Sequence, residues 1–160
     1  MLMEGTLPGM PVVAGRMSVL LATDGSDHAL RAARFLARIM GPLGPDQGVI
    51  HVHTVLSATM EPTSYLGDLS DAPARHEAIR AMVDRATAGA RQVLEEAGIE
   101  TTTSKSFGHP PDEVLAEAES LDVDLVVVGR RGVRMPAALM LGSVSSYLLH
   151  HATMPVLIVP

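Results

Sequence analysis

The chain has 160 residues, of which 47% are hydrophobic and 19% charged, and this composition is typical of one globular domain with its own core. A net charge of −6 at pH 7 disfavours a nucleic-acid or anionic-membrane binder, and an aromatic content of 2% leaves no platform for stacking single-stranded nucleic acid. The chain has no cysteine, no apolar run of about 18 residues and no signal peptide, so we expect a cytoplasmic protein without disulfides, thiolate metal sites or membrane spans.

The N-terminal part of the chain predicts an extension, a strand and a helix. Glycine and proline crowd residues 1–15, so we expect a flexible extension there and a single domain over 16–160. The apolar run 17–23 predicts the first strand, and Ser26 or Asp27 can cap the helix that follows. One face of this helix is apolar as far as the stop at Gly41-Pro42: Ala29, Leu30, Ala33, Leu36, Ala37 and Met40.

The middle of the chain predicts a second strand and a long helix with an unusual connection between them. Residues 48–55 form the expected strand, and 75–97 form a helix that ends at Gly98. The connection, 56–74, is long and polar, and a loop of that length is usually functional or disordered.

The C-terminal part predicts three further strands. Residues 100–107 are rich in threonine and alternate, as in a strand near a sheet edge, and a helix over 111–120 follows. The apolar runs 124–128 and 155–159 complete the set, with a helix-like stretch, 143–151, between them. Strands and helices therefore alternate, and this order is typical of an α/β fold with a parallel sheet wrapped by helices on both faces.

A glycine-rich loop follows the fourth predicted strand. Gly129 and Gly132 are separated by two residues, and nine residues later Gly142-Ser143 begins the last helix. Such a turn lets backbone N–H groups converge on an anion, and Ser143 can cap the helix and offer its hydroxyl to the same anion. The simpler interpretation is that the glycines only make a tight turn.

This spacing resembles the nucleotide loop of the universal stress protein family, in its ATP-binding branch. The resemblance extends over almost the whole chain. It implies a single doubly wound, five-stranded parallel sheet with strand order 3-2-1-4-5, so that strand order reverses between strands 1 and 4. Ligands bind at such a reversal, beside the carboxyl ends of the strands.

By resemblance, the nucleotide lies between the end of strand 1 and the glycine loop. Asp24 and the backbone before it would hold the adenosine side, because a carboxylate accepts hydrogen bonds from adenine or ribose but repels a triphosphate. The simpler role of Asp24 is that of a turn residue or helix cap. Arg131 stands where the family often has His or Arg, whereas Arg130 replaces a small residue. The implied nucleotide-binding residues are Ala22, Thr23, Asp24, Thr54, Val128, Gly129, Arg131, Gly132, Gly142, Ser143, Val144 and Ser145.

The histidines have competing interpretations. His53-Thr54 matches the family's ending of strand 2, which would place Thr54 near the adenine, although His51-Val52 can serve instead. His51 and His53 share one face of the strand and could suggest a metal pair, but we expect a structural role.

Three functions follow from these observations. The preferred one is a universal stress protein that binds ATP as a stress-response switch or regulatory module, with magnesium or manganese as candidate companion metals. The alternatives are a slow ATP hydrolase and a nucleotide-free dimeric scaffold. The sequence leaves ATP, ADP, AMP and cyclic AMP open as the nucleotide. The apolar terminal strand, Pro155 to Val159, is expected at a sheet edge and predicts a homodimer.

Overall fold

The computed structural model describes residues 15–44, 46, 48–57, 72–132 and 141–160. Its elements follow the predicted order, with ends that differ from the expected ones by at most three residues. The strands are β1 (Met17–Ala22), β2 (Gly48–Leu56), β3 (Glu100–Phe107), β4 (Leu125–Gly129) and β5 (Val156–Val159). The helices are α1 (Asp27–Met40), the short 3₁₀ turn η1 (Gly41–Leu43), α2 (Ala72–Glu96), α3 (Pro110–Ser120) and α4 (Ser143–His151). The expected extension over 1–15 and most of the connection 56–74 lie outside the described residues.

The five strands form one parallel sheet in the order β3-β2-β1-β4-β5. This arrangement confirms the predicted fold class and strand order. It places β1 and β4 side by side although more than 100 residues separate them in sequence, with Ala22 beside Val128. The reversal of strand order therefore falls between these two strands, as expected, and β5 lies at the edge of the sheet.

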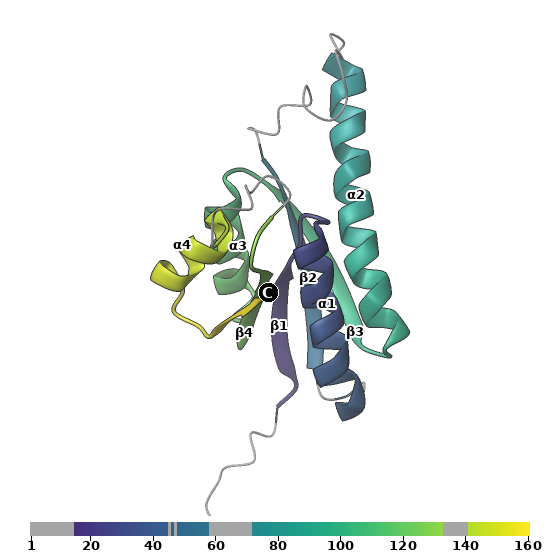
Figure 1. Ribbon diagram of the computed structural model, residues 1–160, viewed down its shortest axis with the longest axis vertical. Coiled ribbons are helices and arrows are strands. Elements are labelled where there is room, and N and C mark those ends of the chain that lie inside the picture. The colour runs from purple at the N-terminus through teal and green to yellow at the C-terminus, as the bar shows by residue number, and fades with distance from the viewer. Residues whose placement is uncertain (1–14, 45, 47, 58–71, 133–140) are drawn as a thin grey trace, which may run out of the picture.

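Helices cover both faces of the sheet (Figure 1). Alternate residues of β1 show how the core divides, because Val19 and Leu21 pack under α1 and α2 while Leu20 packs under α3 and α4. All three side chains have no exposed surface. Burying a side chain of this size stabilises the fold by about 1.5–3 kcal/mol. The two layers thus fix the strand ends that border the candidate site.

The start of α1 is set by its cap. Ser26 has an extended backbone and its hydroxyl accepts a hydrogen bond from the N–H of Ala29 at 3.2 Å, so Ser26 is the N-cap residue. The buried face of the helix then contains Ala29, Ala32, Ala33, Leu36 and Met40. Four of the six predicted positions lie on this face, whereas Leu30 and Ala37 are only partly buried and Ala32 is buried in addition. The cap fixes where α1 begins beside the end of β1.

His51 and His53 lie in a polar ladder between the sheet and α3. The Nδ1 atom of His51 is 2.7 Å from the hydroxyl of Thr102, and the two ring nitrogens of His53 lie 2.8 and 3.1 Å from the hydroxyls of Ser104 and Ser106. His53 is only 1% exposed. Burial lowers the pKa of both histidines, against the opposing effect of Glu117. These contacts support a structural role for the pair.

Candidate functional site

The carboxyl ends of β1 and β4 lie side by side where strand order reverses, and ligands of this fold class bind in the crevice outside such strand ends. After β1 the chain turns through Asp24, and after β4 it turns through Gly129 to Gly132. The Oδ2 atom of Asp24 lies 2.5 Å from the position that a Cβ atom would take on Gly132. The structure therefore brings together two of the predicted site residues that are far apart in sequence, and a side chain at residue 132 would have to displace the carboxylate.

Local hydrogen bonds hold the Asp24 turn in place. The N–H of Ser26 donates to Oδ1 of Asp24 at 3.0 Å, and the N–H of Gly25 donates to the hydroxyl of Thr23 at 3.2 Å. The N–H of Thr23 donates to the carbonyl of His53 in β2 at 2.9 Å. Asp24 is thus a turn residue through Oδ1, and its other oxygen faces the glycine loop. A role of Asp24 as a turn residue is therefore compatible with a role in ligand binding.

Gly129 faces a different neighbour from Gly132. A Cβ atom on Gly129 would lie 2.6 Å from the carbonyl carbon and 2.8 Å from the next amide nitrogen at His28–Ala29 in α1. Backbone atoms cannot swing aside as a side chain can. The absence of a side chain at Gly129 is therefore required for the close approach of α1 to β4, whether or not a ligand is bound.

The glycine loop is joined to the start of α4 by the carbonyl oxygen of Arg130. This oxygen accepts hydrogen bonds from the N–H of Gly142 at 2.8 Å and from the hydroxyl of Ser145 at 2.9 Å. Ser145 is 1% exposed, and Val144 packs against the core under α3 and α4. The predicted role of Ser143 as helix cap is wrong, because extended Gly142 is the N-cap residue and Ser143 is the first helical residue, with no side-chain cap.

Positive charge gathers where the loop meets α1. The Nδ1 atom of His28 and the Nε atom of Arg130 are buried without a hydrogen-bond partner within the described part of the chain. Burial lowers the pKa of His28, and the charges of Arg31, Arg131 and Arg130 lower it further. A buried guanidinium N–H group without a partner is costly unless an anion or water satisfies it, so the region around Arg130 can accept a negatively charged group.

Thr54 does not offer its hydroxyl to the crevice. Its side chain is 3% exposed, and its Oγ1 atom lies 2.9 Å from the hydroxyl of Thr87 in α2. Thr87 in turn donates to the carbonyl of Val83 at 2.8 Å. The side chain of Thr54 therefore holds α2 against the end of β2, and a contact between Thr54 and a ligand would have to use backbone atoms.

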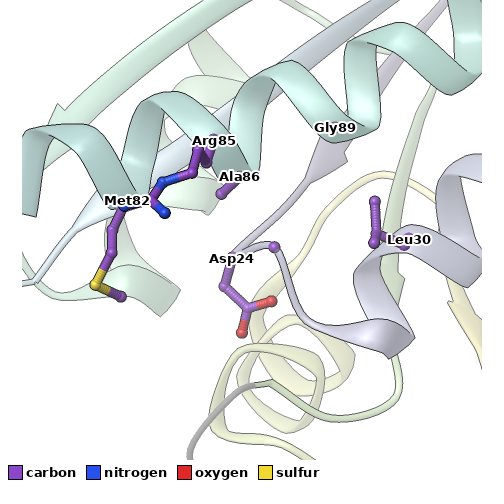
Figure 2. A pocket seen from close by; sticks show the side chains of 7 residues that line it. Asp24, Leu30, Met82, Arg85, Ala86 and Gly89 are labelled. Carbon is purple, nitrogen blue, oxygen red and sulfur yellow. The ribbon is translucent and has the colours of Figure 1, made fainter. Parts of the chain in front are cut away.

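A pocket of about 260 Å³ opens between the Asp24 turn and α2. Figure 2 shows Asp24 on one side of it and Met82 and Arg85, on α2, on the other. We call it the α2 pocket, and its lining consists of Asp24, Gly25, Leu30, Met82, Arg85, Ala86 and Gly89. Met82 and Ala86 stand at helical spacing with the other apolar residues of α2. Ala86 and Gly89 lie one turn apart on this helix, and two such small residues indicate that another segment of the chain approaches the helix closely at this point.

Metal ligands are sparse near the crevice. In the ranges that the structure describes, no group of three His, Cys, Asp or Glu side chains is placed to hold a metal ion. None of the helices within the described ranges is both long and apolar enough to cross a membrane.

Comparison with known proteins gives consistent matches. A model of the universal stress protein family matches residues 15–160. A universal stress protein from Thermus aquaticus is 32% identical over 144 residues, covering 89% of this chain and 97% of the relative. A universal stress protein solved in complex with cAMP superposes with a TM-score of 0.63 at 24% identity, covering 91% of this chain and 98% of that one. A family member from Arabidopsis thaliana, solved with AMP bound, gives 0.66 at 20% identity, covering 89% and 90%. The two solved structures share the fold of this chain.

Proposed function

The chain belongs to the universal stress protein family, and from this premise we propose that it binds an adenine nucleotide, ATP in particular, and acts as a nucleotide-responsive regulatory module. The nucleotide would lie in the crevice between β1 and β4. The observation that carries the proposal is the meeting of Asp24 with the glycine loop, 2.5 Å from the Cβ position of Gly132. This contact brings a hydrogen-bond acceptor and a glycine-rich turn together at the reversal of strand order, where ligands of this fold class bind.

The two sides of the crevice suit the two ends of a nucleotide. Asp24 is an acceptor for ribose or adenine donors and would repel a phosphate, so the nucleoside belongs on its side. The loop and the first turn of α4 supply backbone N–H groups, with Arg131 and Ser143 nearby, and an N-terminal helix turn favours an anion. Arg130 adds positive charge at the same end, where the arginines also lower the pKa of His28. The phosphates therefore belong on the loop side.

The relatives support the adenine class and leave the number of phosphates open, since one was solved with cAMP and another with AMP. We favour ATP for this chain because three arginines near the loop, Arg31, Arg130 and Arg131, lower the pKa of His28, with Asp27 as the opposing charge. A polyphosphate would offset that charge more fully than a single phosphate. A companion magnesium or manganese ion would be bound through the phosphate oxygens.

Mass spectrometry of the purified protein, followed by calorimetry of the nucleotide-free protein with ATP, ADP, AMP and cAMP, tests the proposal. We expect an adenine nucleotide to co-purify or to bind with micromolar or tighter affinity, about −8 kcal/mol or better. ATP should bind more tightly than AMP. Failure of all four nucleotides to bind to a folded protein would refute the proposal and favour a nucleotide-free scaffold.

Slow ATP hydrolysis is the enzymatic alternative, and the arginines near the loop are the observation in its favour, because arginine can stabilise a phosphoryl-transfer transition state. A hydrolase also needs a group that orients water at the γ-phosphate. Asp24 would lie at the nucleoside end, and its Oδ1 atom already accepts from Ser26. We therefore expect turnover with magnesium or manganese below about 1 s⁻¹, the lower end of the usual enzyme range.

The regulatory role includes assembly as a homodimer through β5. This strand lies at the sheet edge, and three of its four residues are partly exposed. The carbonyl of Pro155 accepts from Val126 in β4, and the carbonyl of Val159 accepts from Arg130 directly after β4. By alternation, the backbone groups of Val156 and Ile158 face the open side of the sheet. An apolar edge strand of this kind can pair with its copy across a two-fold axis.

A further inference from the structure

The outer side of α1 carries a row of apolar side chains at the surface (Figure 1). Phe35 and Ile39 lie one turn apart on α1, and Leu43 follows one turn later in η1. Their side chains are 37%, 43% and 57% exposed, whereas Leu36 and Met40 of the same helix pack into the core. Single exposed apolar residues are common, but a row at helical spacing is typical of a surface that binds another molecule. We call Phe35, Ile39 and Leu43 the α1 stripe.

Three exposed arginines run along the solvent side of the α1 stripe: Arg31, Arg34 and Arg38. Asp27 is the only acidic residue of α1. Within the described ranges none of the three arginines is in an ion pair, whereas other cations are held by carboxylates, as in Arg16–Glu100, Arg91–Glu95 and Lys105–Asp84. The chain has 18 acidic residues against 12 lysines and arginines, so a row of arginines without carboxylate partners is a local exception. This positive charge is complementary to an acidic partner.

An anionic membrane fits this surface poorly. A helix that lies in the membrane interface buries a broad apolar face among the lipids. The broad apolar face of α1 is already packed against the sheet, through Ala32, Ala33, Leu36 and Met40, and only the narrow stripe is left for a partner. The net charge of −6 also opposes the approach of the whole molecule to an anionic bilayer. These two features favour a protein partner.

The backbone of α1 decides which kind of protein segment can dock on it. The N–H and C=O groups of a helix are bonded within the helix, so α1 offers no backbone hydrogen bonds to a partner. An extended segment would leave its own backbone groups unpaired on the buried side, whereas a helix satisfies them internally. Apolar side chains at every third or fourth position of a partner helix can interdigitate with Phe35 and Ile39. Carboxylates along one flank of that helix would pair with the arginines.

We propose that the outer face of α1 docks an acidic amphipathic helix of a partner protein. Phe35 and Ile39 are the apolar anchors, and Arg34 and Arg38 contact the acidic flank. The inference goes beyond the proposed function, because none of these four side chains belongs to the proposed nucleotide site. It requires binding to depend on the charge of the partner helix and on both kinds of side chain on α1.

Fluorescence anisotropy with a labelled synthetic helix tests this requirement. The probe is a peptide of about 20 residues, long enough to be helical in water, with leucine on one face and glutamate on the rest. We expect it to bind the full chain with a Kd below about 100 μM. A second peptide has lysine in place of every glutamate and keeps the apolar face. It should bind at least about tenfold more weakly, because its charges would face the arginines.

Replacement of the surface side chains should weaken binding of the glutamate peptide. Arg34→Glu and Arg38→Glu should each lower its affinity about three- to tenfold, because each places a like charge against the acidic flank. Phe35→Ala and Ile39→Ala should lower it by a similar factor, because truncation removes an apolar anchor. All four side chains are exposed, so the variants should stay folded by scanning calorimetry.

Two variants outside the face serve as matched controls. Arg91→Glu makes the same change of charge on α2, where Arg91 is held by Glu95, and Glu95 also accepts from Thr101 in β3. Leu149→Ala shortens an exposed apolar side chain of α4, on the opposite face of the sheet. Both controls should bind the glutamate peptide as the unmodified chain does. The measurements belong at about 0.15 M salt, where charges more than about 8 Å apart are largely screened.

Several outcomes would overturn the inference. No binding of the glutamate peptide to the folded protein, or equal binding of the two peptides, would show that the face does not select an acidic helix. Unchanged affinity in Arg34→Glu and Phe35→Ala would place the peptide elsewhere. Sedimentation of the protein with phosphatidylglycerol vesicles, lost in Arg34→Glu, would assign the face to a membrane. Conversion of a dimer to a monomer by Ile39→Asp, measured by light scattering, would show that a second copy of this chain covers the stripe.

Discussion

Gly129 and Gly132 belong to one turn, yet a methyl group added to each would meet a different part of the molecule. On Gly129 it would lie 2.6 Å from the carbonyl carbon of His28, where carbon atoms ordinarily stay about 3.5–4.0 Å apart. Either α1 or β4 must therefore move by roughly 1 Å. Overpacking of this kind costs about 1–3 kcal/mol. For a domain of 160 residues this corresponds to a melting temperature lower by roughly 2–12 °C.

On Gly132 the methyl group would lie 2.5 Å from Oδ2 of Asp24, the far end of a side chain that can rotate. We expect Gly132→Ala to change the free energy of unfolding by no more than about 0.5 kcal/mol. The displaced carboxylate would no longer face the nucleoside, so ATP affinity should fall about tenfold, or 1.4 kcal/mol. Gly132→Val should have a larger effect of the same sign.

Scanning calorimetry and isothermal titration with ATP measure the two effects on the same samples. Gly15→Ala is the control, because nothing lies within 4 Å of a Cβ atom at that position. The reasoning is refuted if Gly132→Ala lowers the melting temperature as much as Gly129→Ala does. Normal ATP affinity in Gly132→Ala would equally refute the assignment of Asp24 and the loop to the nucleotide site.

Three further predictions follow from the site, the sheet edge and the buried histidines. In an NMR titration, ATP should raise the pKa of His28 more than AMP does, because the bound phosphates offset the charge of the neighbouring arginines. Equal shifts of the His28 pKa with ATP and AMP would indicate that the phosphates bind elsewhere. Ile158→Pro should give a folded monomer by light scattering, since by alternation the N–H of this residue points away from β4; a dimer would contradict pairing through β5. Burial lowers the pKa of His53 below 6.5, so the contribution of its neutral ring to stability is fully present above pH 6.5. As pH falls from 6.5 toward the lower folded-state pKa, this contribution is lost by up to about 1.4 kcal/mol per pH unit. Urea unfolding at pH 7.0 and 5.5 should therefore show a smaller loss for His53→Gln than for exposed His150→Gln, and equal losses would refute this assignment.

Periodicity was sufficient to predict the helices and strands, because each face of the sheet buries a continuous apolar layer. The alternation of Val19, Leu20 and Leu21 between two cores, and the apolar face of α1, follow from patterns of two and of 3.6 residues. These patterns are local and repeat over several turns, so they identify elements well. Strand order came from the family resemblance and not from periodicity, since pairing between β1 and β4 joins segments more than 100 residues apart.

The details of the site depend on distances that a linear pattern does not encode. Ser143 had the right residue type for a helix cap, but the extended backbone of Gly142 moved the cap one residue earlier. Gly129 had the right residue type for a phosphate loop, while its nearest neighbour is the backbone of α1. Met82 stands at helical spacing with the apolar residues of α2, yet its side chain lines a pocket opposite the turn that contains Gly25. Each difference comes from a neighbour that is distant in sequence.

The connection between the proposed ligand loop and the sheet edge gives the regulatory interpretation its physical basis. Arg130 donates its N–H to the carbonyl of Val159 at 2.7 Å, and its own carbonyl accepts from Gly142 and Ser145 at the start of α4. One residue of the loop is therefore bonded both to the last residue of β5 and to the helix whose N-terminus would face the phosphates. A nucleotide that draws the loop toward α4 would alter the backbone beside the edge strand. By linkage, any change that the nucleotide makes in dimer affinity must be matched by an equal change in nucleotide affinity on dimerisation. A hydrolytic centre would need no such bonds to the edge of the sheet, whereas a switch that acts on assembly depends on them.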